Sequence, residues 1–354
     1  MNIVKVDAAA LAAEAAWIAK GAPKRCHVPV LGTVHVSVVD GGLRLRMTDY
    51  GMWRETTVPA DGAHGDGTAV LVSPQQLAQL TKGAKGDALV SVDSTGVEIV
   101  VGARTVKIAS VYADLDDFPQ WTVFAPATGD TAVVLTPEQL KAGLVSVGRD
   151  DTLPMLTGVR FDGDVIASTD RFRLSVVHHG SEGFTGLVPR EALGLFTVGK
   201  GAATVEHGDK AVRISREQRS VIAVELDAQF PKFRQLIPSR DNVTLVATFR
   251  RVDLLGAVAG DAVQLEFQSG GTLTVSGYDY RGDGKPLTVQ TIAADITESD
   301  GLPFTLRCNA TYLRELLKVM TSDVIEFWGT TPTRPMLFTD GGDQFLLMPV
   351  RIPG

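Results

Sequence analysis

The sequence predicts an α+β protein built from three similar domains. Three observations lead to this prediction: a sequence pattern that recurs about every 115 residues, a common order of helical and strand patterns within each repeat, and a length of 354 residues with 44% apolar side chains. Compact domains usually contain about 100 to 150 residues, so a chain of this length and apolar content can bury several cores. A period this long indicates repeated domains and not the short units of a solenoid.

The repeat is marked by an aspartate at the end of a strand-like run. Asp49 in VPVLGTVHVSVVDGGLRLRMTDYG, Asp170 in LPMLTGVRFDGDVIASTDRFRL and Asp279 in LTVSGYDY are separated by 121 and 109 residues. The segments FPQWTVFAP and FPKFRQLIP, which begin at Phe118 and Phe230, form a second mark with a spacing of 112 residues. We therefore expect domains over residues 1–127, 128–240 and 241–354.

Each repeat contains two helical patterns. The first covers residues 7–25, 136–152 and 247–260, and the second covers residues 73–86, 188–201 and 309–322. Thr136 followed by Pro137 is a typical helix start, because the threonine side chain can cap the first turn and proline fits there. Alternating apolar segments such as VIAVEL and LTVSG indicate strands in the remaining sequence. Two helices and several strands per repeat are typical of an α+β fold.

Charge is divided unevenly between the helical segments and the rest of the chain. The six helical segments carry 13 Lys and Arg against eight Asp and Glu, whereas the rest carries 21 against 33. If the helices share one surface, that surface can attract phosphates while the acidic remainder repels nucleic acid. Ordinary solvated helices would show the same charges, so charge alone leaves both interpretations open.

The sequence does not favour a membrane, disulfide or zinc protein. No window approaches the 18 apolar residues of a spanning helix, and the N-terminal MNIVKVDAAALAAEAAW lacks the basic head of a signal peptide, so we expect a cytoplasmic protein. Cys26 and Cys308 lie far apart and outside any metal-binding spacing. We expect both to be ordinary half-buried residues.

Motifs for catalysis are also missing from the sequence. No phosphate-binding loop, zinc-protease motif or nucleophile motif occurs. His178 and His179 are adjacent on a predicted strand, so their side chains would point to opposite faces and could not bind one metal. A solvated turn explains the acidic run at Asp114, Asp116 and Asp117 more simply than a magnesium site does. We therefore expect no enzyme activity, no metal and no cofactor.

The whole chain resembles the β sliding clamp of bacterial DNA polymerase III. Five segments in the family's order carry the resemblance: RDDTLPMLTGVRF, ASTDRFRLSVV, FPKFRQLIP, CNATYLRELL and LLMPVRIPG. It implies three topologically similar domains per chain, each with two helices inside and sheet outside, and a head-to-tail homodimer that forms a ring around duplex DNA. It further implies a non-catalytic processivity factor whose partners, the replicative polymerase, the clamp loader and repair polymerases or ligase, bind through short peptide motifs.

The resemblance also implies a partner-peptide pocket between the second and third domains. Its expected lining residues are Leu156, Thr169, Phe172, Arg173, Leu174, Pro231, Leu236, Asn309, Tyr312, Leu346, Met348, Pro349 and Arg351. Phe172 stands where many family members carry histidine, and Gln235 where many carry arginine. The recurrence of Asp170 at Asp49 and Asp279 favours a structural part for the aspartate, which can accept hydrogen bonds from backbone N–H groups in a turn.

DNA-facing and interface residues can be predicted in the same way. Arg25 matches a basic position that the family uses inside the ring, and the basic residues of the helical segments give the other candidates: Lys82, Lys141, Arg149, Arg250 and Lys318. The strand RTVKIAS has Val106 and Ile108 on one face. We expect it to pair with the third domain of a second chain, because an open apolar edge strand invites pairing.

Two alternatives remain open. An accessory clamp-like scaffold would bind partner peptides without being loaded on DNA, and it would share every motif named above. A multidomain hydrolase would instead need a pocket with an acid, a base or a nucleophile of shifted pKa.

Overall fold

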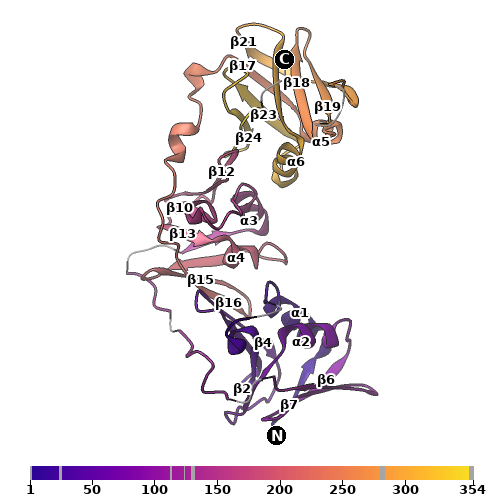
Figure 1. Cartoon of the computed structure of the whole chain (residues 1–354), viewed down its shortest axis with the longest axis vertical. Helices are drawn as coiled ribbons and strands as arrows, with labels where there is room; N and C mark the ends of the chain where they lie inside the picture. Colours follow the sequence, from indigo (N-terminus) through magenta and orange to yellow (C-terminus); the bar gives the residue numbers. More distant parts are fainter. Residues whose placement is uncertain are drawn as a thin grey trace. The chain divides into compact units, whose positions relative to one another are not determined.

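The structure is a computed structural model of the whole chain, and it describes residues 2–23, 26–111, 114–122, 124–128, 132–279 and 284–350 (Figure 1). It forms two compact units. Unit 1 contains Met1–Ala132 and Lys200–Glu225, and unit 2 contains Val133–Gly199 and Leu226–Gly354. No helix among the described residues is long and apolar enough to cross a membrane.

Unit 1 contains two antiparallel sheets. The strand order of the first is β1-β6-β7-β8, with β1 (Asn2–Asp7), β6 (Asp87–Asp93), β7 (Gly96–Val101) and β8 (Arg104–Ala109). The second has the order β5-β2-β3-β4-β16-β15-β14, with β5 (Ala69–Val72), β2 (Val34–Val39), β3 (Gly42–Thr48), β4 (Met52–Pro59), β16 (Arg219–Val224), β15 (Ala211–Arg216) and β14 (Ala203–His207). The pairing of β4 with β16 thus joins strands of the first and second expected domains in one sheet.

Helices α1 (Ala8–Ile18) and α2 (Pro74–Thr81) lie side by side in unit 1 (Figure 1). The side chain of Asp7 caps α1 by accepting a hydrogen bond from the N–H of Ala10 at 2.7 Å, and Ser73 caps α2 in the same way. Leu11 and Ile18 of α1 are fully buried, so these apolar side chains hold the helix against the rest of unit 1.

Unit 2 also contains two antiparallel sheets. The order of the larger is β13-β10-β11-β12-β25-β24-β23-β17-β21, with β13 (Thr185–Pro189), β10 (Gly158–Asp162), β11 (Val165–Thr169), β12 (Arg173–His178), β25 (Asp343–Leu347), β24 (Met336–Asp340), β23 (Val324–Gly329), β17 (Leu245–Arg250) and β21 (Asp295–Ser299). The smaller has the order β20-β19-β18-β22, with β20 (Thr288–Ala293), β19 (Thr272–Tyr278), β18 (Ala262–Gln268) and β22 (Phe304–Asn309). A short strand, β9 (Val133–Leu135), precedes the first helix of this unit.

The described residues of unit 2 form four α-helices: α3 (Pro137–Leu144), α4 (Arg190–Gly194), α5 (Arg251–Ala257) and α6 (Ala310–Val319). The predicted start of α3 is confirmed, because the Thr136 side chain accepts from the N–H of Gln139 while the Gln139 side chain accepts from the N–H of Thr136. Helices α5 and α6 lie next to each other in Figure 1. Together with α1 and α2 they give the six predicted helices, two per repeat.

Three of the predicted helices are shorter than expected by half or more: α3 ends at Leu144 where the prediction extended to Thr152, and α5 and α4 differ as follows. Strand β17 extends to Arg250, into the range 247–260 that was predicted as a helix. The side chains from Val246 to Phe249 point alternately to the two faces of the sheet, and α5 begins only after Arg250. Within residues 188–201 the helix ends at Gly194, and the chain then turns through Gly199 and Gly201, which have φ values of +117° and +78°.

The cysteines differ from each other in burial. Cys26 is half-buried, as expected. Cys308 on β22 is fully buried, which corrects the expectation of a half-buried residue, and burial raises the pKa of its thiol.

The segment that follows β8 packs across the larger sheet of unit 1. The ring of Phe118 lies 5.3 Å from that of His35 on β2, and the Arg46 guanidinium on β3 lies 4.5 Å from the ring centroid of Trp121. Arg213 on β15 stacks on Phe124 at 5.0 Å. Aromatic and cation–π contacts therefore hold this segment against both halves of the sheet.

Candidate functional site

The site begins with the turn that the repeated aspartate forms between β11 and β12. Oδ1 of Asp170 accepts hydrogen bonds from the backbone N–H groups of Phe172 at 2.9 Å and Arg173 at 2.7 Å. The hydroxyl of Thr169 donates to the carbonyl of Arg173 at 2.6 Å. Arg171 occupies the left-handed region with φ of +77°, which a tight turn of this kind requires. The structural part predicted for Asp170 is therefore confirmed.

The same turn is found between β3 and β4. Oδ1 of Asp49 accepts from the N–H groups of Gly51 at 3.1 Å and Met52 at 2.8 Å, and Tyr50 has a φ of +68°. In both places the strand after the turn pairs with a strand from the next repeat: β4 with β16, which we call the first junction, and β12 with β25, which we call the second junction.

The two junctions share one backbone frame. At the second junction the N–H of Met348 donates to the carbonyl of Phe172 at 2.8 Å, and at the first junction the N–H of Val224 donates to the carbonyl of Gly51 at 2.9 Å. The registers correspond as well, since Leu174 pairs with Leu346 where the first junction has Trp53 opposite Ile222. Differences between the junctions therefore come from their side chains.

Side chains on one face of the second junction form an apolar row across four strands. Directly paired residues share a face of an antiparallel sheet, and the row consists of Leu174 (β12), Leu346 (β25), Leu337 (β24) and Trp328 (β23). The corresponding row at the first junction is Trp53 (β4), Ile222 (β16), Arg213 (β15) and Glu206 (β14). There Arg213 and Glu206 form two hydrogen bonds of 2.7 Å, so the row at the first junction is half polar, whereas the row at the second junction is apolar throughout.

The floor of the second junction is covered by the segment after β16. Leu174 and Leu346 have only 2% and 3% of their surface exposed, and they belong to a core cluster with Phe230 and Phe233. Large apolar side chains remain exposed around this floor: Phe172 at 52%, Leu236 at 51% and Met348 at 39%. The floor therefore belongs to the core, and these three residues offer the apolar contact surface.

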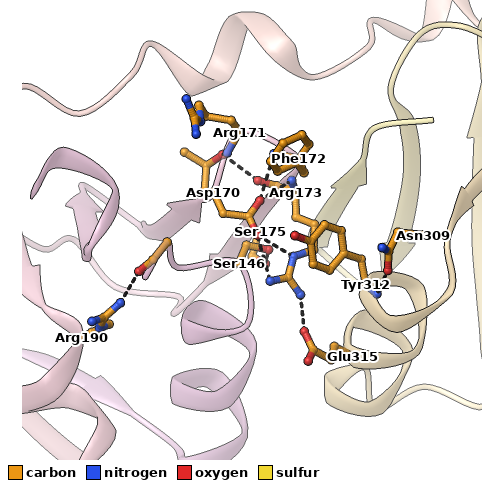
Figure 2. Close-up of polar contacts among 12 residues, drawn as sticks. Ser146, Asp170, Arg171, Phe172, Arg173, Ser175, Arg190, Asn309, Tyr312 and Glu315 are labelled. Atoms are coloured by element: carbon orange, nitrogen blue, oxygen red, sulfur yellow. Dashed lines mark hydrogen bonds and ion pairs between the residues drawn. The ribbon is translucent and has the colours of Figure 1, made fainter. Parts of the chain in front are cut away.

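Arg173 connects the turn to helix α6 (Figure 2). Its guanidinium is largely buried and binds Asp170 at 2.9 Å on one side and Glu315 at 2.5 Å on the other. The same group lies 4.2 Å from the ring centroid of Tyr312. Two carboxylates and one aromatic face thus surround this cation, and these contacts offset the cost of burying its charge.

The capped first turn of helix α6 positions the residues that this helix contributes to the site. The Asn309 side chain accepts from the N–H of Tyr312 at 3.0 Å, which fixes the start of the helix. Tyr312 and Glu315 are three residues apart and therefore lie on one helix face. The ring of Tyr312 also lies 6.2 Å from that of Phe172, so aromatic side chains from both sides of the second junction meet.

A groove of about 290 Å³ opens beside these residues. Its walls come from the segment after α3, the turn and helix α6: Val147, Gly148, Arg149, Asp150, Leu153, Leu156, Asp170, Arg171, Phe172, Arg173, Tyr312 and Glu315. Hydrogen bonds from Thr152 lower the pKa of Asp150. The groove combines an aromatic wall with charged residues of both signs, which suits a polar segment of a peptide better than a buried apolar ligand.

The structure brings many of the predicted pocket residues together. Leu156, Phe172, Arg173 and Tyr312 line one groove, and Leu174 and Leu346 form the adjoining floor. Thr169 holds the turn and Asn309 caps the start of α6. Pro231 borders another groove, and Pro349, which follows Met348, is half-buried. Arg351 lies outside the described residues. The assignment of these residues to a partner pocket stays a prediction.

Sequence reasoning missed Glu315 as part of the site. Its position three residues after Tyr312 on a predicted helix was the available signal, because that spacing places both on one face. Asp170 was assigned to the turn alone, although its second oxygen also binds Arg173.

The predicted DNA-facing residues are exposed side chains on or beside the helices. Lys82 follows α2, Lys141 lies on α3, Arg149 follows α3, Arg250 precedes α5 and Lys318 lies on α6. Arg250 has one weak contact, 3.8 Å from Asp253. Arg25 lies outside the described residues. These positions leave the basic side chains accessible to a polyanion, while their role remains a prediction.

The predicted interface strand is β8, and it occupies an edge of its sheet. Ile108 is 2% exposed and Val106 is half-buried, whereas the intervening Lys107 is exposed and binds Glu98 at 2.6 Å. The predicted alternation of Val106 and Ile108 on one face is therefore present. Within the described part of the chain, no cluster of three His, Cys, Asp or Glu residues could hold a metal ion.

Comparison with known proteins agrees with this architecture. The family model for the DNA polymerase III beta subunit, N-terminal domain, matches residues 2–122. The beta sliding clamp of Streptomyces coelicolor is 26% identical over 99% of this chain and 100% of its own length. Among solved structures, the DNA polymerase III beta subunit of Thermotoga maritima superposes with a TM-score of 0.83 at 18% identity, and each chain is covered completely.

A second solved structure is similar over nearly the whole chain. The sliding clamp of Bartonella birtlesii, solved with griselimycin bound, has a TM-score of 0.81 at 20% identity and covers 99% of this chain and 100% of its own. The repeated helix pairs, the junction ladders and these likenesses together define the fold of a sliding clamp. The match to the N-terminal domain model, the similar beta sliding clamps and the solved structures all indicate a β sliding clamp of DNA polymerase III.

Proposed function

We propose that this chain is the subunit of a homodimeric ring that encircles duplex DNA and tethers the replicative polymerase to it. The exposed apolar side chains of Phe172, Leu236 and Met348 around the second junction carry the proposal, since they offer contact surface for a partner peptide beside a floor that belongs to the core. The proposed ring has six domains, with boundaries in each chain at residues 1–127, 128–240 and 241–354.

The proposed seam of the ring joins β8 of one chain to the third domain of the next. Two features support this arrangement. Strand β8 ends one sheet of unit 1, and strand β20 ends the smaller sheet of unit 2, where Val289 is 58% exposed. Open edges of this kind favour pairing with another chain, and two such edges per chain allow a closed head-to-tail dimer.

Duplex DNA is the proposed cargo of the ring, held without sequence preference. Exposed basic residues at α2, α3, α5 and α6 support transient phosphate contacts: Lys82, Lys141, Arg149, Arg250 and Lys318. The net charge of −7 makes strong attraction of DNA by the whole molecule unfavourable, so encirclement and not contact energy would hold the complex together. We infer that the protein works in the cytoplasm, where the bacterial polymerase copies DNA.

Partner proteins are proposed to bind through short extended peptides at the second junction. Phe172, Leu236 and Met348 offer exposed apolar surface around the floor, and the neighbouring groove offers polar groups for a glutamine side chain. The Bartonella birtlesii clamp binds griselimycin, which supports a ligand site in proteins of this fold. We propose a binding role without catalysis, in which the polymerase supplies the chemistry.

Retention on DNA tests the proposal. The protein is loaded on nicked circular DNA by a clamp loader and washed in about 0.5 M salt, which removes proteins held by phosphate contacts alone. We expect the protein to remain on the circle and to leave after the DNA is linearised. Equal loss from circular and linear DNA would instead support the accessory scaffold that binds peptides without being loaded.

A further inference from the structure

A second groove, of about 380 Å³, lies over strand β10. Its other wall is the chain segment over residues 228–235, and its charged lining residues are Arg160, Asp162, Lys232 and Arg234. Arg160 pairs with Ala167 and Leu187, which belong to the same buried cluster as Leu174. The groove therefore opens on the same sheet face as the apolar row, two strands away from β12.

The charge of this groove is predominantly positive. Three lining residues are cationic, and the one carboxylate, that of Asp162, is bound by Arg234 through contacts of 2.9 and 3.1 Å. Arg160 is half-buried and Lys232 is exposed, and neither forms an ion pair within the described part of the chain. Two cations are thus left to attract an acidic ligand, on a protein whose net charge is −7.

The groove lies next to residues that are predicted for the partner site. Pro231 is one of the predicted pocket residues and also borders this groove, while Leu236 directly follows the lining residue Gln235. Phe230 and Phe233 are buried below the segment, so the wall between the two sites is anchored in the core. One extended peptide could therefore contact the apolar surface at the second junction and continue over this segment.

We propose that the groove over β10 binds acidic residues that flank the partner's apolar motif. Their carboxylates would pair with Arg160, whose planar guanidinium suits bidentate contact, and with Lys232. This inference rests on the proposed partner-peptide function and adds a charge requirement to it. Such exposed pairs contribute modestly to affinity and more to the choice among partners.

Fluorescent peptides can test this inference with the full-length protein. A neutral peptide carries a glutamine and an aliphatic–aromatic pair between serine flanks, and two further peptides carry three glutamates at one end or the other. We expect one acidic peptide to bind about three- to tenfold tighter than the neutral peptide. Arg160→Gln combined with Lys232→Gln should remove this gain while leaving the affinity for the neutral peptide unchanged, and about 0.5 M salt should diminish the gain in the wild type.

The matched control removes two exposed cations elsewhere, Lys82→Gln with Lys85→Gln, and should retain the gain. A gain that persists in the Arg160/Lys232 variant, or that is lost equally in the control, would overturn the assignment to this groove. Tight neutral binding without any gain from acidic flanks would overturn the inference but leave the partner site intact. Failure of every peptide to bind the wild type would overturn the proposed partner site, and this inference with it.

Discussion

Arg173 and Glu315 form an ion pair of 2.5 Å that joins the Thr-Asp turn to helix α6. The arginine is 8% exposed and the glutamate 44%, so the pair extends from the interior to the surface. Since Asp170 binds the same guanidinium, the cation is satisfied without any ligand. We infer that Arg173 positions the site and does not serve as a free charge for a partner.

Replacing Arg173 with alanine should therefore lower the stability of the protein. The change leaves Asp170 without its cation in a nearly buried place and removes the stacking on Tyr312, and we expect a loss of about 2 to 3 kcal/mol in the free energy of unfolding. Urea unfolding measures this loss. Lys5→Ala, which removes an exposed pair with Asp87, should cost less than about 1 kcal/mol; equal effects of the two changes would contradict the positioning role.

Partner binding should depend on the exposed rim residues of the second junction. Combining Leu236→Ala with Met348→Ala removes apolar contact surface, and we expect at least tenfold weaker binding of a fluorescent clamp-binding peptide with little change in stability. The matched control is Val224→Ala, the counterpart of Met348 at the first junction, which should bind normally. Unchanged affinity in a folded double variant would place the partner site elsewhere.

Leu174 needs a different interpretation in such experiments. Its side chain is 2% exposed, so Leu174→Ala should create a cavity and cost about 2 to 5 kcal/mol of stability. A loss of peptide binding in that variant would not distinguish a lost contact from a disturbed core. The unfolding midpoint in urea should be measured beside the affinity.

Dimerisation should depend on the edge strand β8. Val106→Glu adds a charge to the half-buried face of this edge, and we expect a shift from dimer to monomer in sedimentation velocity at micromolar concentration, because strand pairing would then bury an unpaired carboxylate. Val252→Glu, an exposed position on α5, serves as the control and should remain dimeric. A wild-type protein that sediments as a monomer would refute the proposed ring.

The stability of unit 1 should depend on the protonation of His35. Burial, reinforced by Arg46 and Arg44, lowers the pKa of this imidazole to about 4. The unfolded chain, with a pKa near 6.5, binds the proton first as the pH falls, so stability is retained above about pH 6.5 and lost between about pH 6.5 and 4.

The contribution of His35 over this pH range should reach up to about 3 kcal/mol. Urea unfolding at several pH values between 4.5 and 7.5 should show a smaller pH dependence for His35→Gln than for the wild type. His64→Gln, at an exposed histidine, should retain the wild-type dependence. Identical profiles for the wild type and His35→Gln would show that His35 is not the group responsible.

Local signals in the sequence predicted much of the fold. The cap at Thr136, the six helices and the hydrogen bonds accepted by Asp49 and Asp170 all depend on neighbouring residues, which a local pattern contains. Helix lengths were less predictable, since Val246 to Phe249 fit either a helix or a strand until their sheet neighbours are known. Cys308 was misjudged for the same reason, because its burial depends on distant strands.

Long-range pairing was beyond the reach of sequence patterns. The segment that forms β16 is clearly a strand, but nothing within it specifies β4 as its neighbour. The apolar row depends on three such pairings, so Leu337 and Trp328 were not predicted beside Leu174. Arg213 and Glu206 likewise become partners only through the register of β14 and β15.

The junction ladders have a mechanical consequence for a closed ring. The paired residues of β4 and β16 run from Arg219 opposite Thr56 to Ala223 opposite Met52, so separating the repeats there would require several backbone hydrogen bonds to break together. The β12–β25 ladder resists rupture in the same way. If two chains form the proposed ring, we therefore expect neither ladder to be the place where it opens to admit DNA.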